Sequence, residues 1–553
     1  MAGAGRPGRP DIARAKHVGL DLDLERVCAA GPRALEPDDH YRLKTYGVCA
    51  QRHDDLFMLR LRVAGGEVGR DAIAALAAAA REHAGGWVHL TTRQNVELHS
   101  VRLEDVPSVY RRLRPHGLVG RSSCGHTIRN VVACPAATTS ADEPFDVSVD
   151  AKWLSHELVV RSRELNVRLP SRINISLGGC ADCGIEALTN DVGLVACVHD
   201  GVPGYQLWAG GSLGSAPRLA MLLRPFVSRD ELWPAVWTIV EWFCREVGPE
   251  QTTRARLKFA LEAVGESAFR AAFAKAFATS CAEPHATPPN IVLPDANARE
   301  RALAEAPTLG WRSGIEPERT AGYASIVVRV PLGDLLADEL EEIARLAPNG
   351  RLALTRGQNM LIRSVPVKGV PAVVGALADL GLGPDGARGA VDVRACPGLA
   401  FCSLAITASQ PIALAIERAL NGRLDLPRDA TIAVSGCPNS CTKHQAADLG
   451  LAGAKVKVGG RVALGYQLFL GADLAAGLVG EPVLRLLDDE VSDAVVATIE
   501  TWAALRRPGE PPGTTFRRAG LDVVGRAIEM RLRAVGRGDR PSAVESDDLA
   551  VAS

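Results

Sequence analysis

Four cysteines in the C-terminal half of the chain have a spacing that suits metal chemistry. Five residues separate Cys396 from Cys402, three separate Cys437 from Cys441, and 34 residues lie between the two pairs. Four thiolates are the number that a [4Fe-4S] cube requires, and each pair begins with Cys-Pro. Zinc is the alternative, but zinc pairs usually have two to four intervening residues. The spacing therefore favours an iron-sulfur cluster over zinc.

The elements that must position these thiols come in two copies. Residues 90–101 align without gaps on residues 354–365, and six of the aligned positions are identical. An alternating strand, a glycine turn and a helix with apolar residues at helical spacing precede each copy. The strands and helices so predicted are 59–63 and 71–83 in the first copy, and 325–330 and 339–346 in the second. We interpret the chain as two duplicated halves.

A second pair of similar segments follows each copy. Residues 173–180, leading to 191–194, resemble residues 432–437, leading to 448–451. Each segment is an apolar run that ends in a Gly-Cys turn, which predicts a strand with a thiol just beyond its end. The order of the chain is then A-B-A′-B′, with the cysteines in loops, where binding sites usually lie.

The remaining cysteines have a simpler interpretation. The chain contains 13 cysteines, an odd number, and is too long to need disulfide bonds for stability, so reduced thiols are expected. Cys180 and Cys183 lie where the first half repeats the cluster loop, and Cys134 belongs to a Cys-Pro of its own. A second cluster there would need a fourth ligand, for which Cys124 or Cys197 could serve. We expect reduced thiols rather than a second cluster.

Composition limits the classes of protein that fit. A chain of 553 residues predicts three to four domains. Lys and Arg number 63 against 64 Asp and Glu, so no global field attracts nucleic acid or an acidic membrane surface. Hydrophobic residues make up 47% and charged residues 23%, as in folded soluble proteins. No uninterrupted apolar run could span a membrane, and residues 1–19 are interpreted as a loose tail without a secretory signal. We expect a cytoplasmic protein.

An ordered set of motifs resembles the sirohaem- and [4Fe-4S]-dependent nitrite and sulfite reductases. The resemblance runs from about Tyr46 to about Leu505, and the two duplicated halves are also typical of that family. The motifs are Thr91-Thr92-Arg93-Gln94-Asn95, Cys124-Gly125-His126-Thr127-Ile128-Arg129-Asn130-Val131, Leu169-Pro170-Ser171-Arg172-Ile173-Asn174 and the two cysteine pairs.

The resemblance implies roles for particular residues. Cys396, Cys402, Cys437 and Cys441 would hold the cube, and the sulfur of Cys441 would also be the axial ligand of the sirohaem iron. Arg93, Arg129, Arg172 and Asn174 would face the substrate. Gln94, Asn95, Asn130, Asn439 and Cys441 would contact the cofactors. Because sirohaem carries carboxylates and the substrate is an oxyanion, fixed cations are needed despite the neutral net charge.

The chain departs from the family pattern beside Arg172. The family usually has Arg-Lys-aromatic-Lys where this chain has Ser171-Arg172-Ile173-Asn174. The first lysine is replaced by Arg172, which keeps the charge, and the second by Asn174, which does not. The resemblance associates asparagine at that position with nitrite reductases, so nitrite is favoured over sulfite. Because arginine does not release its proton readily, the proton source would be water or a lysine not identified from the sequence.

The expected function is the six-electron reduction of nitrite to ammonia or of sulfite to sulfide. No nicotinamide or flavin module is found, so electrons must come from ferredoxin or a separate flavoprotein. Two alternatives stay open: a monooxygenase of cobalamin biosynthesis resembling precorrin-3B synthase, and a non-catalytic iron-sulfur or zinc protein. An absorption spectrum separates them, because sirohaem has bands in the red that a cluster or zinc lacks.

The resemblance implies an α+β fold with pseudo-two-fold duplication. Two ferredoxin-like half-domains and two larger α/β domains that bind sirohaem and the cluster are expected. The expected divisions are an N-terminal tail and extension (1–40), a first half-domain (41–117), a first sirohaem domain (118–287), a linker (288–317), a second half-domain (318–388), the cluster and sirohaem domain (389–535) and a disordered tail (536–553).

Overall fold

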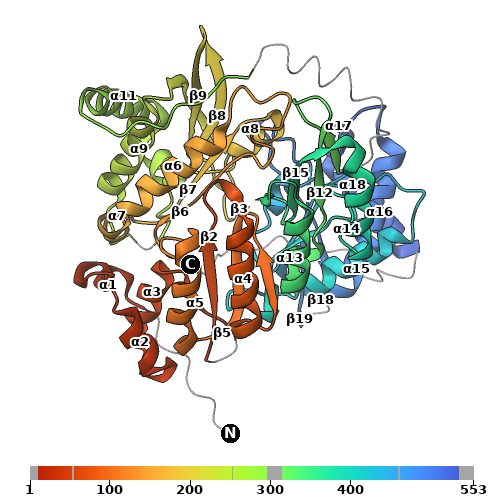
Figure 1. The fold of residues 1–553 in the computed structure, drawn as a ribbon. Coiled ribbons are helices and arrows are strands. Elements are labelled where there is room, and N and C mark those ends of the chain that lie inside the picture. Colours follow the sequence, from red (N-terminus) through yellow and green to blue (C-terminus); the bar gives the residue numbers. More distant parts are fainter. Residues whose placement is uncertain (1–9, 53–54, 252, 295–313, 459–460, 535–553) are drawn as a thin grey trace.

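Among the residues that it describes, the computed structural model has four five-stranded sheets, two in each half of the chain (Figure 1). The structure describes residues 10–52, 55–251, 253–294, 314–458 and 461–534. Most of the predicted linker and the predicted C-terminal tail from residue 536 lie outside the described residues. The domain boundaries given above stay a prediction. Among the described helices, none is long and apolar enough to cross a membrane.

The two half-domains have sheets of the same design. The first sheet runs β1 (Val48–Ala50), β2 (Leu56–Arg62), β5 (Asn95–Arg102), β4 (Trp87–Leu90) and β13 (Asp334–Leu336). The second runs β11 (Ile315–Pro317), β12 (Tyr323–Val328), β15 (Met360–Pro366), β14 (Arg351–Leu354) and β3 (Glu67–Gly69). Their helices are α4 (Arg70–His83), α5 (Val106–Leu113), α13 (Ala337–Leu346) and α14 (Val370–Asp379). The predicted strand, turn, helix, strand order is confirmed in both copies.

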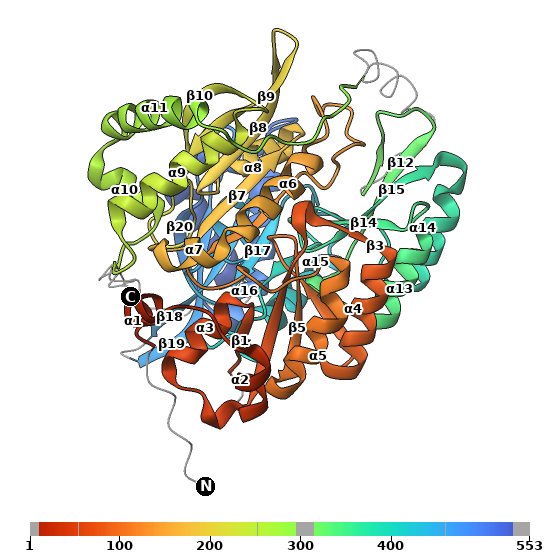
Figure 2. The ribbon, with the colours of Figure 1, turned by 60° about the vertical axis from the view of Figure 1, so that its left-hand side comes forward.

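Each half-domain lends a short strand to the sheet of the other. β13 belongs to the second half but pairs antiparallel with β4, and β3 belongs to the first half but pairs antiparallel with β14. Val68 and Leu335, the central residues of the exchanged strands, are buried. As a result, α4 and α13 lie side by side across the junction (Figure 2). Nothing in the local sequence pattern predicts this exchange.

The two larger domains also share one topology. The first has β6 (Ile128–Val132), β7 (Ile173–Gly178), β8 (Val192–His199), β9 (Val202–Ala209) and β10 (Met221–Ser228) in order across the sheet. The second has β16 (Arg394–Ala395), β17 (Ile432–Ser435), β18 (Leu449–Val458), β19 (Arg461–Leu470) and β20 (Glu481–Leu487). In both, the first three strands are parallel and the last two are antiparallel. Because neighbouring parallel strands end at the same edge of a sheet, the Gly-Cys turns after β7 and β17 lie beside the ends of β6 and β16.

Helices cover the larger sheets and form their cores. In the first domain these helices are α6 (Val147–Val160), α7 (Ser162–Arg168), α8 (Ala181–Ala187), α9 (Leu232–Val247), α10 (Leu257–Val264) and α11 (Glu266–Ala282). In the second they are α15 (Ser409–Asn421), α16 (Val491–Leu505), α17 (Pro512–Ala519) and α18 (Leu521–Ala534). Each domain has its own buried apolar cluster, which keeps the strand ends in place.

The N-terminal segment is ordered from Ile12 onward, so the interpretation of residues 1–19 as a loose tail is wrong for α1. α1 (Ile12–Val18) begins at Asp11, whose side chain accepts a hydrogen bond from the Arg14 backbone amide. Lys16 on α1 is buried and donates to the Leu169 carbonyl at 2.5 Å. α2 (Leu24–Ala30) and α3 (Pro37–Thr45) follow. The basic and glycine-rich composition of this stretch hid a helix that tertiary contacts stabilise.

Candidate functional site

The four cysteines of the second half meet at the edge where β16 and β17 end. Cys396 follows β16 and Cys437 follows β17, and the Gly436 amide between them donates to Cys396 Sγ at 3.1 Å. Burial, and then the Cys396, Cys437 and Cys402 thiols, raise the pKa of Cys441, as expected when the four thiols share one site. Thr92 from the first half donates to the Cys441 carbonyl at 2.7 Å. Both halves of the chain therefore build this site.

The arrangement of these four thiols fits a group larger than a single ion. All 13 cysteines are free. Among the described residues, no three of these four sulfur atoms lie within 4.8 Å of one another. Cys441 is exposed, Cys396 and Cys402 are partly exposed, and Cys437 is buried. Four free thiols that are spaced in this way match the ligand set of an iron-sulfur cube, in which each thiolate binds a different iron atom.

Three predicted arginines converge on the same region. Arg93 lies in the turn between β4 and β5, Arg129 lies in β6, and Arg172 immediately precedes β7. Burial and the Arg129 guanidinium lower the pKa of Arg93 to about 9. Repulsion from Arg256, followed by burial, lowers the pKa of Arg172 to about 9, and burial lowers that of Arg129. All of these side chains stay cationic at neutral pH, so the site holds closely spaced positive charges.

The arginines are anchored by backbone groups and keep donors free. Arg93 donates to Asn190 Oδ1 at 3.0 Å and to the Asn130 carbonyl at 2.8 Å, and Arg129 donates to the Ser123 and Gly125 carbonyls. The buried Nε atoms of Arg93 and Arg129 have no hydrogen-bond partner among the described residues. Arg172 is repelled by both Arg256 and Arg129. Orphaned donors on repelling cations fit an anionic ligand with several carboxylates or a small oxyanion.

Three further cations at the site were not predicted. Arg256, which precedes α10, pairs with both oxygens of buried Asp191 at 2.9 and 2.8 Å. Lys258 is buried, and burial followed by repulsion from Arg256 lowers its pKa to about 8. Burial lowers the pKa of Lys443, two residues after Cys441, to about 8. The alternation Arg254, Arg256, Lys258 in the sequence was the only signal for the first two.

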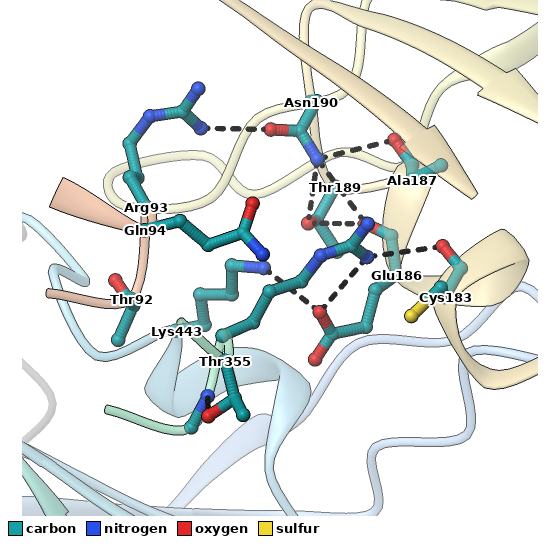
Figure 3. Close-up of polar contacts among 12 residues, drawn as sticks. Thr92, Arg93, Gln94, Cys183, Glu186, Ala187, Thr189, Asn190, Thr355 and Lys443 are labelled. Carbon is teal, nitrogen blue, oxygen red and sulfur yellow. Dashed lines mark hydrogen bonds and ion pairs between the residues drawn. The ribbon is translucent and has the colours of Figure 1, made fainter. Parts of the chain in front are cut away.

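A polar network joins Arg93 to the second half of the chain (Figure 3). Arg93 binds Asn190, while Glu186 on α8 accepts from Lys443 at 3.3 Å and from Arg356 at 3.2 Å. Burial opposes ionisation of Glu186, but Lys443 and Arg356 lower its pKa to about 2. The half-buried carboxylate therefore stays charged and binds Lys443 and Arg356, which come from two different loops.

The predicted amide ligands have different roles. Gln94 is fully buried, and its Nε2 donates to the Leu354 carbonyl at 2.7 Å and to the Ala133 carbonyl at 3.0 Å. Gln358, its counterpart in the second copy, donates to Leu90 and Ala395 in the same way. Both ends of the Gln94 amide bind backbone groups, and its contact with a cofactor stays a prediction.

The other predicted amides divide into two groups. Asn95 and Asn130 are buried, and Asn130 donates to the carbonyls of Val63, Arg93 and Gln94. Asn174 and Asn439 are close in the sequence to Arg172 and Cys441, and Asn439 is exposed. The Oδ1 atom of Asn174, like those of Asn95 and Asn130, is a buried acceptor without a partner among the described residues. Asn130 thus shapes the turn that carries Arg93, and contact of these four asparagines with a cofactor or substrate stays a prediction.

Comparison with known proteins places these features in a family. A family model described as the nitrite and sulphite reductase 4Fe-4S domain matches residues 124–280 and 386–534. A model of the nitrite/sulfite reductase ferredoxin-like half domain matches residues 50–116 and 316–380. The α+β fold with duplicated ferredoxin-like half-domains is confirmed.

Relatives named as nitrite reductases and relatives named as sulfite reductases are both similar over most of the chain. A ferredoxin–nitrite reductase of Synechococcus elongatus is 30% identical over 81% of this chain and 86% of its own. A sulfite reductase [ferredoxin] of Mycobacterium tuberculosis is 29% identical over 82% of this chain and 80% of its own. The solved structure of the Mycobacterium tuberculosis NirA protein superimposes with a TM-score of 0.79 at 25% identity, covering 93% of this chain and 98% of that one.

The matched ranges contain the site. The four second-half thiols lie in one matched 4Fe-4S segment, Arg129 and Arg172 in the other, and Arg93 in the first matched half-domain. Nitrite and sulfite reductases use sirohaem and a [4Fe-4S] cluster, and the thiols and free cationic donors fit both groups. The chain is therefore an oxidoreductase that belongs to the nitrite and sulfite reductase family.

Proposed function

We propose that this protein reduces nitrite to ammonia in preference to sulfite, with six electrons supplied by ferredoxin. The relatives' names support a ferredoxin donor, and nitrite and sulfite both occur among them. Reduction of sulfite to sulfide is the second candidate. The observation that carries the choice of nitrite is the net charge around Arg172 and Asn174.

The chain's own residues would hold both cofactors. Cys396, Cys402, Cys437 and Cys441 would bind the cluster, and the Cys441 sulfur would be shared with the sirohaem iron. The bound pair supplies stored electrons and the metal at which the oxyanion is reduced. The free donors of Arg93, Arg129 and Arg256 support binding of sirohaem carboxylates and of the substrate anion.

The structure adds a cation to the site without adding net charge. Arg256 is held by both oxygens of Asp191, so this pair contributes nothing to the net charge. Arg93, Arg129 and Arg172 then leave three uncompensated guanidinium charges, Lys258 adds one more while it is protonated, and Asn174 contributes none. A site with fewer cations favours nitrite, which has one negative charge, over the more highly charged sulfite.

Arginines would orient the anion, and protons must come from elsewhere. A guanidinium does not release its proton near neutral pH, so Arg93, Arg129 and Arg172 would polarise the bonds to oxygen. Lys258 lies beside Arg256 and has a pKa of about 8, which suits a group that exchanges a proton near neutral pH. We infer that Lys258, through ordered water, takes part in proton delivery.

The test adds a charge at Asn174. Asn174→Lys is expected to raise kcat/KM for sulfite relative to nitrite by about tenfold or more, because one added charge at a desolvated site is worth over 1 kcal/mol. Steady-state rates with each anion, with dithionite-reduced methyl viologen as donor, measure the ratio. Arg129→Ala should impair both substrates.

Asn349→Lys is the matched control, because Asn349 is exposed and lies between α13 and β14 in the second half-domain, outside the group formed by Arg93, Arg129 and Arg172. It should leave the ratio of sulfite to nitrite activity unchanged. A wild-type preference for sulfite that Asn174→Lys does not alter would overturn the choice of nitrite.

A further inference from the structure

A second group of cysteines lies in the first half, at the edge that corresponds to the cluster site. Cys134 follows β6, Cys180 follows β7, and Cys183 lies on α8. The Cys134 and Cys180 sulfur atoms are 3.4 Å apart, and all three sulfur atoms lie within 4.8 Å of one another. In the part of the chain that the structure describes, no other three His, Cys, Asp or Glu side chains converge so closely.

Comparison of the duplicated halves shows why a cube does not fit here. Cys134 corresponds to Cys396, since both precede proline after the first parallel strand. Ser140 then stands where Cys402 stands, six residues on, and both donate a backbone hydrogen bond to the fourth preceding residue at 2.9 Å. The first half thus has no cysteine at the fourth position of the ligand set.

The separation of the sulfur atoms points in the same direction. Thiolates that bind one tetrahedral ion at about 2.3 Å lie about 3.8 Å from one another. A cube separates its thiolates further, because each binds a different iron atom. The three first-half sulfur atoms are close together, whereas the four second-half sulfur atoms are not. The two edges therefore suit different metals.

We propose that Cys134, Cys180 and Cys183 bind a single Zn²⁺ ion, with solvent as the fourth ligand. Cys180 and Cys183 have the two-residue spacing typical of zinc sites, and thiolate is a ligand that zinc prefers. Cys180 is half-buried, so solvent reaches the site. The three thiols release their protons to solvent on binding, and no electron is transferred.

The surroundings support a bound thiolate complex. Three thiolates and Zn²⁺ carry one net negative charge, which a nearby cation would stabilise. The buried Arg356 guanidinium is such a cation, because it donates to the Cys183 carbonyl at 3.1 Å and to the Leu177 carbonyl at 3.3 Å. A Cβ at Gly178 would lie 2.6 Å from Gly184, so glycine lets α8 approach the end of β7. This close approach brings Cys183 to Cys180.

Such an ion would fix α8 to the end of β6. α8 carries Glu186, which binds Lys443 and Arg356 in the network that reaches Arg93 (Figure 3). The zinc site would therefore stabilise the loops beside the arginines without contacting the substrate. This inference does not depend on the proposed function.

The test measures metals in the full-length, cofactor-loaded protein. Zinc and iron per chain are determined by mass spectrometry after incubation with Zn²⁺ and removal of loose metal with a chelator. We expect about one zinc per chain, and the zinc X-ray absorption spectrum should show three sulfur ligands at about 2.3 Å. These wild-type measurements do not depend on any variant folding.

Variants then locate the ion. Cys180→Ser should lower zinc retention at least about tenfold and leave iron unchanged. Cys197→Ser is the matched control, because Cys197 is also half-buried, lies on the neighbouring strand β8 and is outside the group.

Four results would overturn the proposal. The first is wild-type protein without zinc, and the second is zinc that Cys180→Ser does not reduce. The third is iron that falls in Cys180→Ser, which would indicate a second cluster. The fourth is a thiol titration of the protein before incubation with Zn²⁺ that finds two reactive thiols missing, which would indicate a disulfide. In the first, second and fourth cases, an iron content that matches one cube and one sirohaem per chain would leave the proposed function intact.

Discussion

At the scale of single residues, the site depends on cations and thiols that have few partners within the chain. The free Nε atoms of Arg93 and Arg129 are costly in the protein alone, because buried donors and closely spaced cations are unfavourable without a ligand. Function explains this cost, because bound anions and metals would satisfy the same groups. The residue with the sharpest consequence is Cys441.

Cys441→Ser is expected to abolish the coupling between cluster and sirohaem. A hydroxyl is a poor ligand for soft metals, and the Cys441 sulfur is the only bridge that we propose. The nitrite reduction rate should fall by more than about 100-fold, the upper range for residues that merely orient a metal ligand. Rates with reduced viologen and the visible spectrum measure both effects, with Cys281→Ser as the control. Near-normal turnover with both chromophores present would show that Cys441 is not the axial ligand.

At the scale of elements, the exchanged strands β3 and β13 join the halves. His89 on β4 donates from Nδ1 to Asp334 Oδ1 on β13 at 2.6 Å, and His89 is buried. Burial and Arg60 oppose protonation, but Asp334, with help from Glu97, raises the pKa of His89 above 6.5. The histidine is charged in the folded protein at pH values where it would be neutral when unfolded.

This junction should lose stability as the pH rises. Because the pKa of His89 is raised in the folded protein, the protonated histidine adds to the free energy of unfolding. This contribution is complete below pH 6.5 and disappears as the pH rises through the folded-state pKa. The difference in free energy of unfolding between wild type and His89→Gln should therefore be larger at pH 6 than at pH 9. Denaturant titrations at both pH values test this. His116→Gln is the control, because His116 is exposed. Its free energy of unfolding should differ from that of wild type by the same small amount at pH 6 and at pH 9. A difference that grows with pH would contradict the assignment.

At the scale of the whole molecule, the halves should unfold together. β13 comes from the second half but completes the first half's sheet, and Gln94 and Gln358 each bind a carbonyl of the opposite half. A substitution that destabilises one half should therefore lower the free energy of unfolding of both. The cofactor site, which uses both halves, needs this shared rigidity.

Leu335→Ala tests that coupling. Leu335 is 1% exposed, and its truncation should cost about 2–5 kcal/mol in free energy of unfolding. Tryptophan fluorescence, to which mainly first-half tryptophans contribute, and the visible absorbance of the cofactors should shift to the same lower urea concentration. Leu336→Ala is the matched control, since Leu336 is 56% exposed and adjacent. Separate transitions for the two signals would show that the halves unfold independently.

The sequence by itself determined the features that local patterns encode. Periodicity indicated β2, α4 and their second-half counterparts, and the repeat indicated the duplication, because side-chain alternation and helical spacing depend on near neighbours. The spacing of Cys396, Cys402, Cys437 and Cys441 indicated a cluster site, because ligand number and type are visible without coordinates. The family motifs added the three arginines.

Only the tertiary structure decided which distant groups meet. The strand exchange, the pairing of Arg256 with Asp191 and the ion pairs of Glu186 join residues far apart in the sequence, and nothing local signals them. The sequence also did not show that the buried Gln94 amide donates to the Leu354 carbonyl of the other half. The first-half cysteines, Cys134, Cys180 and Cys183, could not be assigned from spacing. The separation of their sulfur atoms, which distinguishes one ion from a cube, depends on how the loops after two parallel strands pack against each other.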